Sequence, residues 1–332
     1  MNILITGGLG YIGSHTVIEC INNGHNAIIV DNLYNSKIEV LHKLNKFLNK
    51  DITFYKIDMQ DIKELENVFK ENKIDAVIHF AGYKAVGESV EKPLKYYENN
   101  IGITINLLKL MEKYGVKKII FSSSATVYKE SKILPLTENM PLGVTNPYGR
   151  SKLIIEEILQ DIAFSDKDFK AVILRYFNPI GAHISGLFGE DNNGIPNNLM
   201  PYIVKVAKGE LEYLRVFGND YNTKDGTGVR DYIHVVDLAK AHIKAIKAFD
   251  FSKNINIYNI GTGTGYSVLD IVKNFEKATG IHIPYKIVER RSGDIGEYYA
   301  DSKKAKKEID FTAEYGILEM CKDAWNYEKN RG

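Results

Sequence analysis

The sequence predicts an α/β fold with a doubly wound parallel sheet, followed by a smaller, mixed α/β region towards the C-terminus. Short runs rich in Val, Ile and Phe alternate with longer segments of helical periodicity, and these runs are apolar on both faces, as in strands covered by helices. This alternation is typical of a doubly wound sheet. The expected strands are Asn2–Thr6, Ala27–Asp31, Ile52–Lys56, Ala76–Phe80, Lys118–Ser122 and Ala171–Tyr176. The expected helices lie near Ile12–Asn23, Ile62–Glu71, Pro93–Tyr114 and Pro147–Ile162.

The character of the chain changes after Asn178. Gly181–Asn198 is rich in Gly, Asn and Pro and is typical of a loop, and mixed short strands and helices follow it. We therefore predict a dinucleotide-binding domain over residues 1–177 and a substrate domain over residues 178–332. Because Ile255–Ile260 has the pattern of a buried strand, a segment near 230–262 is expected to return to the first domain.

Composition excludes several classes of function. Lys plus Arg (43) nearly balance Asp plus Glu (42), so the chain has no overall attraction to nucleic acid or to an anionic membrane. The two cysteines, Cys20 and Cys321, are far apart, and the eight histidines show no ligand spacing, so neither a disulfide framework nor a metal site is expected. No leader pattern or apolar run of about 18 residues occurs. We expect a cytoplasmic protein.

A glycine-rich turn joins the first expected strand to the first expected helix. The segment GGLGYIG contains Gly7, Gly10 and Gly13 in a Gly-x-x-Gly-x-x-Gly spacing. Glycine permits a tight turn, close approach of a pyrophosphate to bare backbone, and close packing of helix on strand. The free N–H groups and positive dipole end of the helix then face the phosphates. A glycine cluster alone could be a plain turn, but here a strand precedes it and an amphipathic helix follows.

Two carboxylates follow at strand ends. Asp31 ends the second expected strand, 18 residues after Gly13. A carboxylate at this place accepts hydrogen bonds from the adenosine ribose and repels a 2′-phosphate, which favours NAD over NADP. Asp58 ends the third strand segment and could accept from the adenine amino group, or it could be a solvated acid.

A tyrosine and a lysine are candidates for proton transfer. A Tyr-x-x-x-Lys pattern occurs four times, but only Tyr148 and Lys152 lie in the first turns of a well-signalled helix, with Asn146 to cap it and Pro147 at the first position. Residues four apart share one face of a helix. We expect the lysine ammonium to lower the pKa of the Tyr148 phenol towards neutrality. Ser124, at the end of the preceding strand, can donate to the same substrate oxygen.

Taken together, these segments resemble a known enzyme family. GGLGYIGSHT, VIHFAGYKAVGESV, FSSSATVY, PYGRSK, LRYFNPIGAH, GIPNNLMPYI, FGNDY, DGTGVRDYIHV, YNIGTG and RRSGD are similar, in order and over roughly residues 1–330, to segments of the UDP-glucose 4-epimerases of the extended short-chain dehydrogenase/reductase superfamily. The resemblance implies interconversion of UDP-glucose and UDP-galactose through a 4-keto sugar. Tyr148 would remove the proton of the 4-hydroxyl, and a tightly bound NAD would take the C4 hydride and return it to the other face.

The resemblance also implies contact residues and an assembly. The implied cofactor contacts, with the glycines of the turn, are Tyr11, Ile12, Asp31, Asn32, Asn35, Ser36, Asp58, Phe80, Ala81, Lys84, Asn99, Tyr148, Lys152 and Phe177. The implied substrate contacts are Ser124, Asn178, Asn198, Leu199, Arg230, Arg291, Asp294 and Tyr298, in which the two arginines would clamp the pyrophosphate. A homodimer formed through the helices near Pro93–Tyr114 and Pro147–Ile162 is implied as well.

Three alternatives stay open beside this interpretation. Nucleotide-sugar dehydratases and decarboxylases resemble this chain but have acidic residues where it has Ala125 and Thr126. A catalytically silent NAD-binding protein would be expected to lack Tyr148 or Lys152. An epimerase of broader range would also accept N-acetylated UDP-sugars, against which the bulk of Tyr298 argues. Lys129 and Arg150 depart from the residues common in the family, Gly and Lys respectively, but neither has an assigned role.

Overall fold

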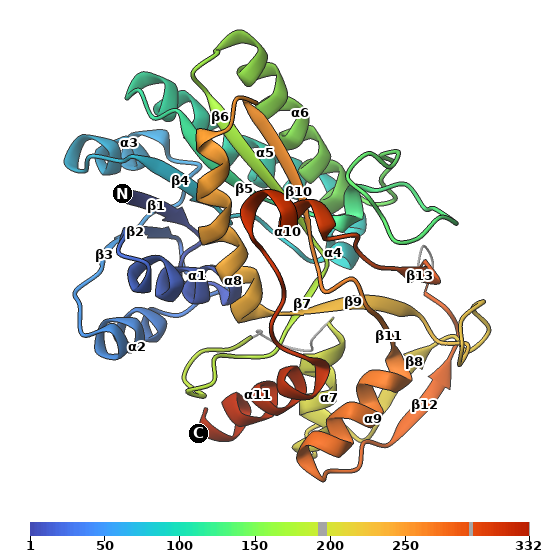
Figure 1. Ribbon diagram of the computed structural model, residues 1–332. Helices are drawn as coiled ribbons and strands as arrows, with labels where there is room; N and C mark the ends of the chain where they lie inside the picture. Colours follow the sequence, from blue (N-terminus) through green and yellow to red (C-terminus); the bar gives the residue numbers. More distant parts are fainter. Residues whose placement is uncertain (192–197, 292–294, 332) are drawn as a thin grey trace.

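The main body of the protein is a seven-stranded parallel sheet covered by helices. The structure is a computed structural model that describes residues 1–191, 198–291 and 295–331. The sheet has the strand order β10-β6-β5-β4-β1-β2-β3 (Figure 1). Its strands are β1 (Asn2–Thr6), β2 (Asn26–Asp31), β3 (Thr53–Lys56), β4 (Ala76–His79), β5 (Lys118–Ser124), β6 (Lys170–Tyr176) and β10 (Ile255–Ile260). The predicted fold class is confirmed, with each of the six expected strands within two residues of its expected bounds.

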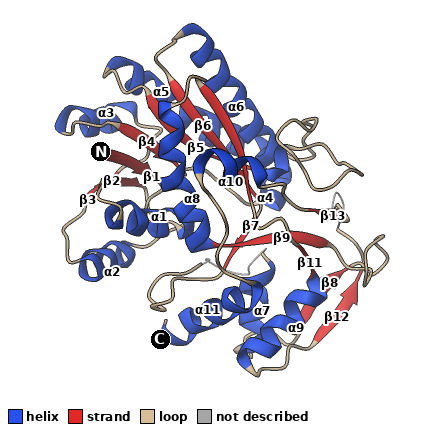
Figure 2. Cartoon of the chain, in the orientation of Figure 1, coloured by secondary structure: helices blue, strands red, loops and turns tan. Residues whose placement is uncertain are grey.

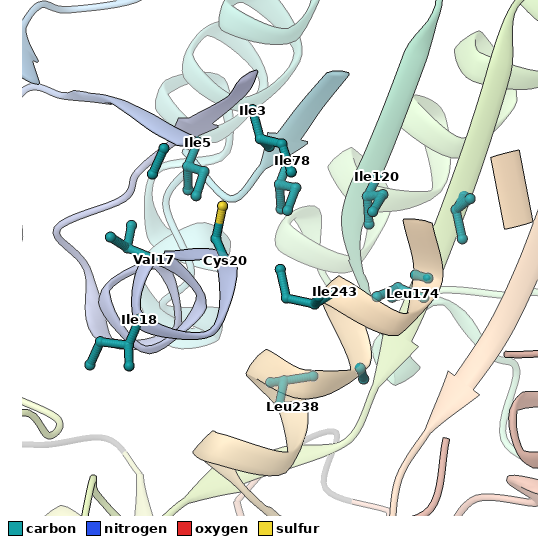
Figure 3. Close-up of a cluster of buried hydrophobic side chains, with 14 of the residues drawn as sticks. Ile3, Ile5, Val17, Ile18, Cys20, Ile78, Ile120, Leu174, Leu238 and Ile243 are labelled. Atoms are coloured by element: carbon teal, nitrogen blue, oxygen red, sulfur yellow. The ribbon is translucent and has the colours of Figure 1, made fainter. Parts of the chain in front are cut away.

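Helices cover both faces of this sheet because alternate strand residues point to opposite sides. On β1, Ile3 and Ile5 pack towards one set of helices, whereas Leu4 packs towards the other. The first set is α1 (Tyr11–Asn22), α2 (Ile38–Leu48), α8 (Val235–Ala245) and α10 (Lys303–Ile309); the second is α3 (Ile62–Glu71), α5 (Pro93–Lys113) and α6 (Pro147–Ser165). Figure 3 shows the first core, where Val17 and Cys20 of α1 and Leu238 and Ile243 of α8 lie on the same face of the sheet.

A smaller region lies beyond the carboxyl ends of these strands (Figure 2). Its sheet consists of β7 (Asn178–Ile180), β9 (Val229–His234), β11 (Gly265–Ser267) and β13 (Glu297–Tyr298), and β8 (Leu214–Phe217) pairs in parallel with β12 (Tyr285–Val288). The helices α7 (Leu199–Ala207), α9 (Val268–Thr279) and α11 (Ile317–Asn330) pack around a core of their own. The remaining helices are α4 (Val86–Glu91) and two 3-10 turns, Ala125–Val127 and Ile246–Asp250.

The chain passes between the two regions more than once. It leaves the main sheet after β6, forms β7 and β9 in the second region, and returns as α8 and β10 before leaving again. Within the predicted returning segment, α8 and β10 therefore lie in the main body, whereas β9 pairs in the second sheet. The division of the chain into domains at residue 178 stays a prediction.

Three expectations from the sequence concern disulfides, metal sites and membrane-spanning segments. Cys20 and Cys321 are both buried free thiols. Among the described residues, no group of three or more His, Cys, Asp or Glu side chains could hold a metal ion. In the same part of the chain, no helix has the length and apolar character that a membrane crossing needs.

Candidate active site

A cleft of about 1330 Å³ runs along the carboxyl edge of the main sheet, where the second region faces it. β1 lies between β2 and β4, so the direction of strand order reverses there and the loops after these strands diverge. All predicted site residues that the structure describes line this cleft: Gly7, Gly10, Tyr11, Ile12, Gly13, Asp31, Asn32, Asn35, Ser36, Asp58, Phe80, Ala81, Lys84, Asn99, Ser124, Tyr148, Lys152, Phe177, Asn178, Asn198, Leu199, Arg230, Arg291 and Tyr298. Asp294 lies outside the described residues.

The glycine turn packs its backbone very tightly at two positions and less tightly at a third. Gly7 has a φ of +69°, and a Cβ there would lie 2.9 Å from the backbone nitrogen of Ala81. A Cβ on Gly13 would lie 2.2 Å from the carbonyl oxygen of Gly7. At Gly10, by contrast, the nearest atom to such a Cβ is 3.3 Å away. Since no side chain caps α1, its first N–H groups are available to an anion in the cleft.

Asp31 organises the loop that follows β2. Its carboxylate accepts hydrogen bonds from the backbone N–H of Leu9 (3.1 Å), the N–H of Leu33 (2.9 Å) and the hydroxyl of Ser36 (2.8 Å). Leu33 has a φ of +62°, which is unfavourable for a branched side chain, so these bonds hold a strained turn. The side-chain amide of Asn32 donates to Asp58 (3.1 Å). The two carboxylates predicted from strand ends thus lie at one end of the cleft.

Tyr148, Lys152 and Ser124 meet where β5 and the start of α6 adjoin the cleft. Asn146 caps α6 by accepting from the N–H of Gly149 (2.8 Å), as the sequence predicts. The Lys152 ammonium donates to the carbonyl of Ser122 (2.7 Å) and lies 5.9 Å from the centroid of the Tyr148 ring. The strand therefore holds the lysine beneath the tyrosine, and Ser124 follows two residues after the carbonyl that the lysine binds.

Burial opposes ionisation of both groups. Burial raises the pKa of Tyr148 to about 12, against a hydrogen bond with Ser124 that lowers it, and Tyr298 adds to the rise. Burial lowers the pKa of Lys152 to about 8, whereas the charge of Glu156 acts in the opposite direction. The expectation that the lysine ammonium lowers the pKa of Tyr148 towards neutrality is wrong in this structure, because the loss of hydration on burial dominates and raises that pKa.

The second region contributes cations and aromatic rings to the other end of the cleft. The Arg230 guanidinium lies 4.7 Å from the ring centroid of Tyr298, whose hydroxyl donates to the side-chain oxygen of Asn178 (3.4 Å). The Arg291 guanidinium lies 4.7 Å from the centroid of Phe217. Phe217 was missed as a site residue, although it is the first residue of the FGNDY segment that carries the family resemblance.

A second missed residue links the two regions. Glu190 accepts from Lys84 (3.0 Å) and from the side-chain amide of Asn198 (3.1 Å), so it joins a predicted cofactor residue to a predicted substrate residue. Its place in a loop rich in Gly and Asn gave no periodic signal that could have singled it out.

Comparisons with known proteins agree with this geometry. The family model described as "NAD dependent epimerase/dehydratase family" matches residues 3–261. The UDP-glucose 4-epimerase of Bacillus subtilis (strain 168) is 57% identical over 330 residues, which cover 99% of this chain and 97% of that protein. The chain belongs to the UDP-glucose 4-epimerase family.

Solved members of the UDP-glucose 4-epimerase family have the same fold. The enzyme from Bifidobacterium longum, in complex with NAD+ and UDP, superposes with a TM-score of 0.96 at 54% identity, covering 100% of this chain and 99% of that chain. The UDP-Glc/GlcNAc 4-epimerase from Campylobacter jejuni has a TM-score of 0.85 at 36% identity, with 99% of each chain covered. The resemblance predicted from the sequence, including NAD as the cofactor, is confirmed.

A substitution in the glycine turn tests the packing described above. Gly13→Ala places a Cβ against the Gly7 carbonyl, so we expect it to lower the free energy of unfolding by about 2 kcal/mol or more, as overpacking does. Gly102→Ala, in α5, is the matched control because its Cβ meets nothing within 4 Å. That variant should be neutral or slightly more stable. Equal denaturant midpoints for the two variants would contradict the packing argument.

Proposed function

We propose that this protein interconverts UDP-glucose and UDP-galactose by epimerisation at C4, through a 4-keto sugar, with NAD held in the cleft. The observation that supports it best is the meeting of Tyr148, Lys152 and Ser124 in the same cleft as the glycine turn and two arginines. Such a reaction needs three parts: a proton acceptor, a binding site for the dinucleotide, and cations for the diphosphate of the UDP-sugar.

The residues of the turn and of the β2 loop fit NAD. The bare backbone of Gly10, which lines the cleft, and the uncapped start of α1 suit its pyrophosphate, and Lys84 adds a cation to the same groove. Asp31 suits the adenosine ribose because it keeps acceptor capacity beside its three protein donors. When bound, NAD supplies the acceptor for the C4 hydrogen and its electron pair, and its nicotinamide ring brings a positive charge.

The chain's own groups move the proton. Tyr148, as the phenolate, accepts the proton of the sugar 4-hydroxyl, and the Ser124 hydroxyl donates to the same oxygen. The Lys152 ammonium, fixed on the Ser122 carbonyl, faces the tyrosine ring and favours the phenolate form. The same three groups act in reverse once the 4-keto sugar has turned its other face towards the cofactor.

The second region binds the nucleotide part of the substrate. Arg230 and Arg291 provide guanidinium groups that suit a pyrophosphate, and each is steadied by an aromatic ring. Asn178, Asn198 and Leu199 line the same end of the cleft, and Asp294 is assigned to the ribose of UDP by family resemblance alone.

This chain lacks the acidic residues at positions 125 and 126 that a nucleotide-sugar dehydratase or decarboxylase would need. Ala125 has no ionisable side chain, and the hydroxyl of Thr126 donates to Ser124 (3.0 Å). Elimination of water needs a proton donor and acceptor at the neighbouring carbons, which these two residues cannot provide.

Assembly and location are also part of the proposal. Leu94 on α5 and Phe164 on α6 are large apolar side chains about 80% exposed, which supports a homodimer formed through α5 and α6. Two buried free thiols suit a reducing cytoplasm.

An aromatic contact closes the loop that contains Asn35 and Ser36 over the cofactor end of the cleft. The rings of Tyr34 and Tyr83 lie 4.9 Å apart. Lys95 donates to the Tyr34 hydroxyl (3.0 Å) and to Glu88 (2.7 Å). We propose that this contact slows the release of NAD, as the reaction requires, because the cofactor is restored within each cycle.

Loss of the Tyr148 hydroxyl should slow turnover strongly without releasing the cofactor. We expect the wild-type protein, with UDP-galactose and no added NAD, to form UDP-glucose, and Tyr148→Phe to be about 10²- to 10⁴-fold slower, the usual contribution of such a group. Tyr114→Phe alters another Tyr-x-x-x-Lys pair, which is remote from the cleft, and should keep full activity. Undiminished turnover by Tyr148→Phe, with NAD still bound, would exclude the mechanism.

The bulk of Tyr298 should decide the accepted substrates. We expect the wild type to use UDP-glucose and UDP-galactose well and the N-acetylated pair poorly, because the tyrosine ring restricts space near the sugar. Tyr298→Ala should raise kcat/KM for UDP-GlcNAc by at least about tenfold, in the range of steric discrimination. Comparable turnover of both pairs by the wild type would instead favour the broader epimerase.

Removing the Tyr34 ring should speed cofactor loss. We expect NAD to leave Tyr34→Ala about fivefold faster than the wild type, measured by chromatography of NAD after dilution or charcoal treatment, since an aromatic contact contributes about 1 kcal/mol. Tyr34→Phe keeps the ring contact and should fall between the two. If Tyr34→Ala retains NAD as well as the wild type, the loop is not closed by this contact.

A further inference from the structure

A buried ion pair lies directly behind the candidate catalytic groups. Glu156 follows Lys152 by four residues on α6, so Tyr148, Lys152 and Glu156 occupy one face of the helix. The Glu156 side chain is fully buried and that of Arg175, on β6, is 2% exposed. Arg175 donates from Nε to both carboxylate oxygens (3.0 and 3.2 Å) and from Nη2 to one of them (2.5 Å).

The same carboxylate also joins α6 to β5. It accepts a short hydrogen bond from the hydroxyl of Ser123. Ser123 lies between Ser122, whose carbonyl binds the Lys152 ammonium, and Ser124, which contacts Tyr148. The bond from Ser123 therefore fixes the three-serine segment in register with the turn of α6 that contains the lysine.

Arg175 is held from its other side. Its Nη1 donates to the Tyr128 hydroxyl (3.2 Å), which itself donates to the side-chain oxygen of Asn259 on β10 (2.6 Å). A buried ion pair is expensive unless its hydrogen bonds are satisfied, and in many proteins an apolar pair would be equally stable. The full set of partners here suggests a task beyond stability.

The charge of Glu156 stands out among the groups that face Lys152. His79 on β4 is neutral, because burial and the lysine lower its pKa to about 3. Tyr148 on α6 and Tyr176 on β6 are neutral phenols at pH 7, since burial raises the pKa of each. Among the described residues, Glu156 is the one whose charge raises the pKa of the lysine.

We propose that Glu156 is a positioning residue for the epimerisation: held by Arg175, its carboxylate locks α6 against β5 and presents a negative charge to the Lys152 ammonium. Without this charge the buried ammonium would lose its proton at lower pH. An uncharged lysine no longer favours the Tyr148 phenolate. This inference rests on the proposed function, because it concerns the pH range in which that site works.

The sign of the pH effect follows from these contacts. Activity that needs the Lys152 ammonium falls as the pH rises through the lysine pKa, which lies at about 8 in this structure. Removing the Glu156 charge lowers that pKa further, so the alkaline limb of the profile of kcat against pH should move to lower pH by about one unit. KM for UDP-galactose should change little, because Arg230 and Arg291 are untouched.

The test compares three variants of the NAD-containing protein over pH 6 to 10, with kcat, KM, bound NAD and Tm measured for each. Glu156→Gln should show the shifted alkaline limb, with kcat about tenfold below the wild type at about pH 9 but less than about twofold below it at about pH 7. Because it leaves Arg175 buried without its partner and can lose stability, the double variant Glu156→Gln/Arg175→Met is included. The double variant should recover Tm while keeping the shifted limb.

Glu157→Gln is the matched control, since it removes one negative charge from the next residue of the same helix at an exposed position. Its pH profile should equal that of the wild type. A uniform loss of kcat at all pH values, with an unmoved limb in the double variant, would reduce Glu156 to a structural residue and overturn the inference. Absence of epimerase activity in the wild type would instead refute the proposed function.

Discussion

All seven strands of the main sheet run in the same direction, and the site depends on that constraint. Parallel strands place their carboxyl ends at one edge, so the glycine turn after β1, Asp31 at the end of β2 and Ser124 at the end of β5 reach one cleft. Each of these residues is far from the others in sequence. The right-handed crossovers through helices then bring the start of α1 and the start of α6 to the same edge.

The chemistry at this edge requires ionised groups in a place that disfavours them. Burial raises the pKa of Tyr148 and lowers the pKa of Lys152, so each group is pushed towards its neutral form. Fixed partners oppose this effect of burial. The Ser122 carbonyl accepts from the Lys152 ammonium, the Ser124 hydroxyl contacts the Tyr148 phenol, and the Glu156 carboxylate lies behind the lysine. Such preorganised groups act without reorganisation during the reaction, which is why a dry site can still move protons.

Sequence reasoning predicted the main sheet and the residues of the cleft well, for identifiable reasons. Buried parallel strands are continuous apolar runs, and the helix that holds Tyr148 begins with a cap and a proline, so both could be found locally. The second region was described only in outline, because β7, β11 and β13 have two or three residues each and form by long-range pairing. Glu190 was missed for the same reason, since its partner Lys84 is distant in the chain. The electrostatic balance at Tyr148 was predicted with the wrong outcome, because a sequence does not reveal how deeply a pair is buried.

The path of the chain between the two regions has a consequence for how the protein can be divided. A fragment that stopped after β6 would lack β10, which pairs with β6, and α8, which packs on α1 and β6. The backbone of β6 would then become an open edge, and apolar residues such as Leu174 would meet solvent. Exposed edges and apolar faces of this kind promote aggregation. Residues 1–176 are therefore not expected to form a soluble domain on their own. They need α8 and β10, which begin more than fifty residues later in the chain.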